Sequence, residues 1–127
     1  MLQRDYILEM IEQFVKGVVE SLRRALTKAD PQAAVEAEEA LAGLVDLDPE
    51  VAMQLAPESL VTMMSLSGIG DSVADYAAYT LSLLAHAYDG MGDHETAAMR
   101  RAQAQAVADA YGYDFSEVPA GLEGLMD

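Results

Sequence analysis

Residues 2–26 read LQRDYILEMIEQFVKGVVESLRRAL, and this stretch decides the fold. Its apolar side chains recur at alternating steps of three and four residues, which is the spacing of one face of an α-helix. Arg23 and Arg24 close the stretch, where the negative end of a helix dipole favours basic side chains. Residues 2–26 therefore predict one long amphipathic helix.

A helix with so broad an apolar face must bury that face against other helices. The partner helices come from the same chain or from a second copy of it. The sequence thus predicts an all-α protein, and part of the first-helix face offers a surface for self-association as a homodimer. The residues expected on that surface are Tyr6, Met10 and Phe14.

Composition supports the all-α prediction. Hydrophobic residues make up 52% of the 127-residue chain but aromatic residues only 6%, and the β-branched and aromatic enrichment that strands need is missing. Alanine and methionine take that place, and both are good helix formers. The length is that of a single domain, expected to span 1–127.

Turn signals divide the rest of the chain into further helices. Asp30-Pro31 and Asp48-Pro49 each combine a capping aspartate with a proline in the first helical turn. Gly68 to Gly70 forms a loop, after which Asp71 is expected to cap the next helix. The expected arrangement is a bundle of about six helices, with helices near 31–45, 49–55, up to 66, 71–91 and up to 111, and an irregular tail over 113–127.

Charge excludes several partners. The formal net charge is −15, and the stretch from Ala29 to Met99 contains no lysine or arginine. Nucleic acid and anionic membrane surfaces both require clustered basic residues, so neither is expected as a partner. The acidic middle is expected to be a solvated surface, or else a landing surface for a basic partner segment.

No other composition feature points to a cofactor or a membrane. The chain has no cysteine, so it offers no disulfide and no thiolate metal site. Charged residues interrupt the N-terminus, which therefore lacks the apolar core of a signal peptide, and no apolar run reaches the length of a membrane span. A cytoplasmic protein without a cofactor is expected.

The last two predicted helices, LAHAYDGMGDHETAAMRRAQAQA from Leu84 onward, have the landmark spacing of a helix–turn–helix repeat. The landmarks are Leu84, Ala85, Tyr88, Gly92, Asp93, Ala97 and Ala104. This pattern resembles a tetratricopeptide unit, although Arg101 and Asp109 stand where that family prefers an aromatic residue and a proline. Arrays of such repeats need several units, so the resemblance implies a tetratricopeptide-like domain and not a true array.

A second resemblance concerns the opening segment RDYILEMIEQF. It is similar to the start of a little-characterised bacterial family of short helical proteins. That resemblance implies the same general helical architecture, and it implies no activity.

The tetratricopeptide resemblance also implies a binding face. Groove residues of that family carry over onto Tyr79, Ser82, His86 and Asp89, which share one helical face. Such a face binds a peptide or a neighbouring helix, so a non-catalytic protein-interaction module is the leading interpretation. The alternative is that the long first helix fills this groove.

Two other classes of function stay open. A small enzyme or metal-dependent protein would use His86 with nearby carboxylates and His94, because imidazole and carboxylate groups together bind zinc. No catalytic residue and no native metal site is expected, since the spacing of these groups is common in acidic helices. The remaining alternative is a structural subunit of an assembly.

Overall fold

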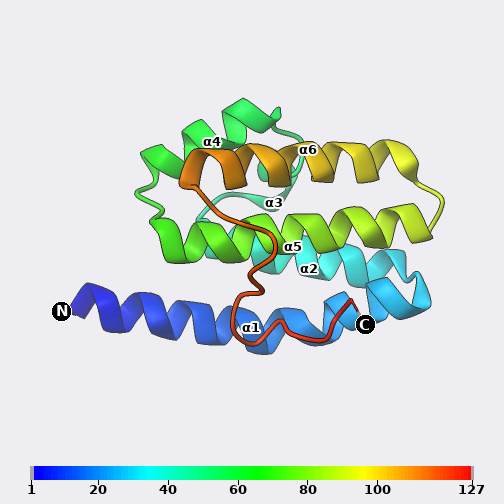
Figure 1. Cartoon of the computed structure of the whole chain (residues 1–127), viewed down its shortest axis with the longest axis horizontal. Helices are drawn as coiled ribbons and strands as arrows, with labels where there is room; N and C mark the ends of the chain where they lie inside the picture. The colour runs from blue at the N-terminus through cyan, green and yellow to red at the C-terminus, as the bar shows by residue number, and fades with distance from the viewer. Residues whose placement is uncertain (1, 127) are drawn as a thin grey trace.

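The computed structural model describes residues 2–126, with side chains from Asp5 onward, and it is all-helical over that range (Figure 1). The helices are α1 (Leu2–Lys28), α2 (Pro31–Leu44), α3 (Pro49–Ala52), α4 (Pro57–Leu66), α5 (Asp71–Gly90) and α6 (His94–Tyr111). The long N-terminal helix and the C-terminal helix pair predicted from sequence are confirmed. No helix within these residues has the length and apolar character that crossing a membrane requires.

The helices lie in three layers (Figure 1). The first layer is α1, the second is formed by α2 and α5, and the third contains α6 with α3 and α4. Helix α5 packs most extensively on α6, and α1 packs on both α2 and α5. The two helices of the middle layer therefore support α1 on one side and the remaining helices on the other.

Local capping explains where the helices begin and end. The Asp30 carboxylate accepts a hydrogen bond from the Gln32 amide at 3.0 Å, and the Asp48 carboxylate accepts one from the Glu50 amide at 2.9 Å. Gly112, in the left-handed region at φ 71°, ends α6. Satisfying these otherwise unpaired amides favours a helix start at each site.

Three details of the sequence prediction are wrong. The first helix continues beyond residue 26 to Lys28, and α3 ends at Ala52 and not at residue 55. The N-cap of α5 is Gly70, and Asp71 is the first helical residue. Its carboxylate thus lies at the positive end of the helix dipole without capping the helix.

The core is built from leucines and many alanines. Small side chains on α2 and α5 let the helix axes approach closely, while leucines from α1, α2 and α5 fill the space between layers. Fully buried members include Leu22, Leu41, Leu81, Leu84, Ala37, Ala42, Ala74 and Ala78. This core holds α1 and α2 in a fixed relation to the layer beneath.

A buried polar network holds the side of α2 that faces α5 and α6. Arg100 Nε donates to Glu38 Oε2 at 2.8 Å, with both side chains 8% exposed, and the Tyr88 hydroxyl donates to the same oxygen at 2.9 Å. Arg100 Nη1 also donates to the Met53 carbonyl at 2.8 Å, and Gln103 Nε2 to the Leu55 carbonyl at 2.9 Å. The network thus ties α2, α5 and α6 to the segment after α3.

This network corrects the interpretation of the acidic middle as a solvated surface at one residue, Glu38. Glu38 belongs to that segment but is buried and paired with Arg100. Burial and the neighbouring Glu38 carboxylate raise the pKa of the Tyr88 hydroxyl above its ordinary value. A charge in this position is stable because its partner and hydrogen bonds replace the lost water.

The C-terminal tail, residues 112–126, crosses back over the bundle to lie against α1 (Figure 1). Leu122 and Leu125 are buried, and the Tyr76 hydroxyl donates to the Ala120 carbonyl at 2.6 Å. A Cβ on Gly121 would lie 2.7 Å from a Val15 methyl group, so the tail backbone touches α1 directly. The tail is irregular and is also docked by apolar contacts.

Candidate functional site

The four residues expected on the α5 binding face lie in different surroundings. Tyr79 and Ser82 are half-buried, whereas His86 is exposed. Asp89 lies within 2.8 Å of His94 Nδ1, and its other carboxylate oxygen accepts a hydrogen bond from Arg101 Nη2 at 2.6 Å. The hydrogen bonds from His94 and Arg101 lower the pKa of Asp89. This end of the face therefore contacts α6.

The other end of the α5 face lies beside α1 and the tail. The Tyr76 ring meets Phe14 of α1 edge-on, with centroids 6.2 Å apart. Tyr113 of the tail lines one hollow together with Asp75 and Tyr76 of α5. Burial, followed by Asp75 and Tyr79, raises the pKa of Tyr113 to about 12. The tail, together with α1, therefore occupies space beside the N-terminal half of α5.

The residues considered for metal binding engage in other local contacts. Asp93 caps α6 by accepting a hydrogen bond from the Thr96 amide at 3.1 Å, and Asp89 pairs with His94 and Arg101. Within residues 2–126, no group of three or more histidine, aspartate or glutamate side chains is placed to hold a metal ion.

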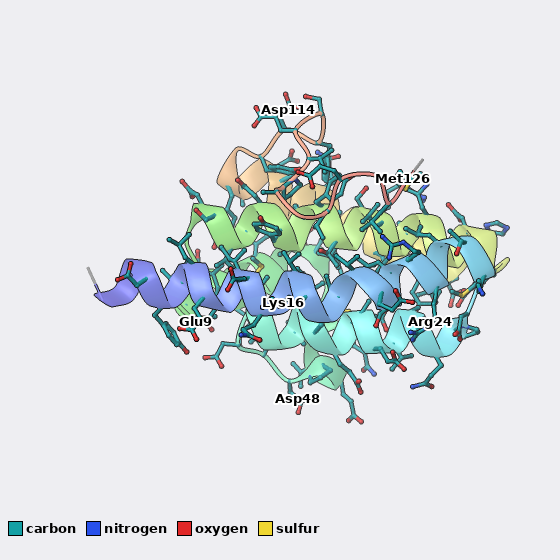
Figure 2. All side chains as sticks on the ribbon, turned by 90° about the horizontal axis from the view of Figure 1, so that it is seen from below. Glu9, Lys16, Arg24, Asp48, Asp114 and Met126 are labelled. Atoms are coloured by element: carbon teal, nitrogen blue, oxygen red, sulfur yellow. The ribbon has the colours of Figure 1, made fainter. Side chains whose placement is uncertain are left out.

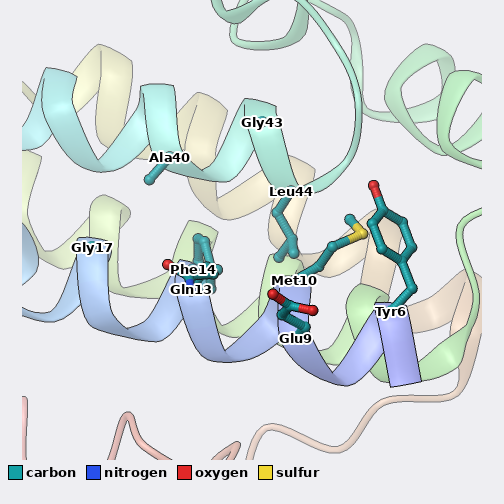
Figure 3. Close-up of a pocket in the computed structure, with 9 residues that line it drawn as sticks. All are labelled: Tyr6, Glu9, Met10, Gln13, Phe14, Gly17, Ala40, Gly43 and Leu44. Carbon is teal, nitrogen blue, oxygen red and sulfur yellow. The ribbon is translucent and has the colours of Figure 1, made fainter. Parts of the chain in front are cut away.

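A groove of about 390 Å³ lies between α1 and α2 (Figure 3). We call it the α1–α2 groove; its lining residues are Tyr6, Glu9, Met10, Gln13, Phe14, Gly17, Ala40, Gly43 and Leu44. Most of these side chains are apolar or small. In Figure 3, Tyr6 and Met10 rise from α1 toward the end of α2, while Leu44 points back toward α1.

Glycines keep the α1–α2 groove open. A Cβ added at Gly17 or at Gly43 would meet nothing within 4 Å, so each glycine faces empty space and not a packed neighbour. Glycine in a helix interior costs about 0.5–1 kcal/mol relative to alanine. The helices thus carry a stability cost at the two positions where a side chain would narrow the groove.

A second hollow, of about 460 Å³, extends the groove past the end of α2. It shares Tyr6, Met10, Gly43 and Leu44 with the α1–α2 groove and continues along the turn between α4 and α5. We call this hollow the groove extension; its remaining lining residues are Ile7, Asp46, Ser67, Gly68, Ile69, Gly70 and Val73. The two hollows therefore adjoin at Tyr6 and Met10 of α1 and at the end of α2.

The self-association residues expected from the sequence all line this groove, at different depths. Tyr6 is 64% exposed, Met10 is half-buried and Phe14 is 6% exposed. Sequence reasoning missed the α2 wall, although Ala40 and Gly43, three residues apart, are a readable signal of an open helix face. It could not pair that wall with α1, because the pairing depends on tertiary packing.

Comparison of this chain with known protein families, with curated proteins and with solved structures gave no match. The tetratricopeptide resemblance and the resemblance of the opening segment therefore stay predictions.

Proposed function

We propose that this protein is a non-catalytic protein-interaction module and that a partner binds in the α1–α2 groove. The observation that carries the proposal is an exposed apolar edge beside an apolar hollow. Tyr6, which lines the groove, and Ile7, which lines its extension, are 64% and 38% exposed. Large apolar side chains gathered around a concave surface are typical of sites that bind another protein.

The C-terminal tail, which covers another side of α1, supports this assignment. The chain uses its own tail to cover another side of α1, where Leu122 is fully buried. Figure 2 shows the tail, ending near Met126, on one side of α1 and α2 on the other. The groove beside α2 receives no such cover from residues 2–126, so a partner is needed to remove its apolar surface from water.

The α5 face remains a separate prediction from the tetratricopeptide resemblance. Its test is a Tyr79→Ala/His86→Ala variant, which should keep the fold and lose any partner bound through α5. The α1–α2 groove is the stronger candidate because its lining residues form one hollow. On the α5 face, Asp89 is already engaged by α6.

Selection from a displayed peptide library tests the proposal even though the partner is unidentified. The wild-type protein should enrich peptides that fail to bind a Gly17→Leu variant, in which the new side chain projects into the groove. Gly90→Leu is the matched control, since a Cβ there also meets nothing within 4 Å but the site lies at the end of α5. Circular dichroism should show the wild-type helix content in both variants.

Peptides that bind the wild type and the Gly90→Leu control but not Gly17→Leu would support the groove as the site. Enriched peptides that bind all three proteins equally would contradict it. An enriched set that is lost only in Tyr79→Ala/His86→Ala would move the site to α5.

A further inference from the structure

We propose that the occupant of the α1–α2 groove is an amphipathic α-helix of another protein, with lysine or arginine along the edges of its apolar face. This inference rests on the proposed function and specifies the chemistry of the partner. It combines the shape of the groove with the charge around it.

The shape favours a helix. The α1 wall runs from Tyr6 to Gly17, which is about 16 Å, or three helical turns, at 1.5 Å per residue. Both walls are helices whose backbone groups are paired internally, so they offer no edge to an extended peptide. An extended segment would bury its own amide and carbonyl groups without partners, whereas a helix pairs them internally.

The open glycine positions suit a packed helix as well. Gly17 on α1 and Gly43 on α2 present backbone without a side chain toward the hollow, and Ala40 adds only a methyl group. Larger side chains of an incoming helix fit into these gaps as ridges fit into grooves between packed helices. Tyr6 and Met10 then supply large apolar contacts toward the start of α1.

The charge around the groove is acidic. Among the side chains that the structure describes, from Asp5 onward, the charged residues that line the groove and its extension are Glu9 and Asp46, and none of the lining residues is lysine or arginine. Within the described side chains, neither carboxylate forms an ion pair. The charged neighbours Asp5, Glu12 and Glu39 are exposed.

The basic residues of the fold are mostly engaged at other sites. Arg23 pairs with Glu20, Arg24 with Glu36, Arg100 with Glu38 and Arg101 with Asp89. Lys16, which is exposed on α1 (Figure 2), comes directly before the groove residue Gly17. The carboxylates beside the groove are therefore available to a basic partner, which they would both attract and orient.

The same charge argues against a second copy of the chain as the occupant. A symmetric dimer through this surface would place the same patch of both copies in one interface. Glu9 and Asp46 of each copy would then be desolvated near their counterparts, between two chains that each carry a net charge of −15. Like charges brought together in this way oppose association.

Three designed helical peptides of about 18 residues test the inference, a length that gives five turns. One has lysines beside its apolar face, one has glutamates at the same positions, and one has the lysine composition in scrambled order. Fluorescence anisotropy gives each Kd for the wild type, for Gly17→Leu, for Gly90→Leu and for Glu9→Gln/Asp46→Asn.

The wild type should bind the ordered lysine peptide at least about tenfold more tightly than the other two peptides, a difference of about 1.4 kcal/mol. Glu9→Gln/Asp46→Asn should reduce the preference for lysine over glutamate to about threefold or less, because two ion pairs at the edge of the interface are lost and each contributes about twofold. Gly17→Leu should weaken the ordered lysine peptide by about tenfold. Gly90→Leu should match the wild type.

The contrary outcomes separate the inference from the proposed function. If the glutamate peptide binds as tightly as the ordered lysine peptide and Gly17→Leu weakens both, the proposal of a basic partner is wrong, and the groove is still supported as the binding site. If Gly17→Leu leaves every Kd unchanged, both are wrong. If no peptide binds at concentrations up to about 1 mM, the proposal of a basic helical partner is wrong. It is also wrong if light scattering shows a dimer that Gly17→Leu dissociates, and the occupant of the groove would then be a second copy of the chain.

Discussion

Two flanks of α1 carry apolar side chains, and the chain treats them in opposite ways. On the tail flank, where Val15 meets the C-terminal tail, Leu122 is fully buried and the Gly121 backbone touches the helix. On the groove flank, which faces α2, Tyr6 is 64% exposed and Gly17 faces empty space. The chain itself thus covers the tail flank, and the groove flank is the one to which we assign the proposed partner.

The largest expected effect on stability concerns the side of α2 that faces away from the groove. Arg100→Met removes the partner of the buried Glu38 carboxylate, which lies on α2 about 200° around the helix from the groove residue Ala40. Leaving a buried charge unpaired costs about 3–5 kcal/mol. Urea unfolding should show that loss in the free energy of unfolding.

A second substitution separates the charge from the packing in that experiment. In Arg100→Met/Glu38→Leu both members of the ion pair are replaced by apolar side chains, and more than half of the lost stability should return. Exchange of a buried ion pair for apolar groups is often close to neutral. A double variant no more stable than Arg100→Met would mean that the cost lies in the other bonds of the network, from Arg100 to the Met53 carbonyl and Gln103 and from the Tyr88 hydroxyl to Glu38.

The next largest effect tests the tail flank. Leu122→Ala empties a fully buried site, and a leucine-to-alanine change of this kind costs about 2–5 kcal/mol. Leu66→Ala is the matched control, because Leu66 is 78% exposed and should change the free energy of unfolding by about 0.5 kcal/mol or less. Equal, small effects in urea unfolding would show that the tail does not stabilise the bundle.

Alanine at two glycines should change stability in opposite directions on the two flanks. Gly121→Ala, at φ 95° and 2.7 Å from Val15, should cost about 2 kcal/mol through strain and crowding. Gly17→Ala on the groove flank should stabilise by about 0.5–1 kcal/mol, because helix propensity rises and nothing is displaced. Thermal unfolding of both variants should show a lower Tm for Gly121→Ala and a higher Tm for Gly17→Ala than for the wild type.

A third glycine isolates the cause on the tail flank. Gly124 also has a positive φ, 81°, but a Cβ there meets nothing within 4 Å. Gly124→Ala should therefore show the cost of strain alone, about 1 kcal/mol. If it costs as much as Gly121→Ala, contact with Val15 plays no part. If Gly17→Ala destabilises, the groove flank is tighter than described.

Periodicity and capping made most of the fold predictable. The steps of three and four residues in 2–26 indicated α1, and Asp30-Pro31 marked the start of α2, because both signals are local. The burial of Glu38 was not predicted, because it depends on a contact that is distant in sequence. Its burial depends on Arg100, which lies 62 residues further along the chain, and no local pattern reports that pairing.

The candidate site was predictable on one side only. Tyr6, Met10 and Phe14 followed from the period of α1, and all three line the groove. The facing wall at Ala40 and Gly43 depends on which helices pack together, and that is a property of the tertiary structure. The cover on the tail flank requires the irregular tail to fold back, and its apolar residues lack a period that would show where they dock.

The smallest expected effect is a pH dependence of the tail where it lies beside α5. Burial, together with Asp75 and Tyr79, raises the pKa of Tyr113 from 10.0 to about 12 in the folded protein. At pH values between these two pKa values, the unfolded chain has released the Tyr113 proton and the folded protein still holds it. The unfolded chain therefore binds fewer protons, so the free energy of unfolding falls as pH rises. Below pH 10 the contribution is fully present.

Urea midpoints at about pH 9 and about pH 11 measure this effect, because the pair of values spans the ordinary pKa. The wild type should lose more stability over that interval than Tyr113→Phe, which has no hydroxyl to ionise and no donor for the Glu117 carbonyl. The difference between the two proteins removes contributions from every other titrating group. Equal losses would mean that the surroundings of this hydroxyl add nothing to stability, so that the docking of the tail rests on its contact with α1, at Leu122 and Gly121.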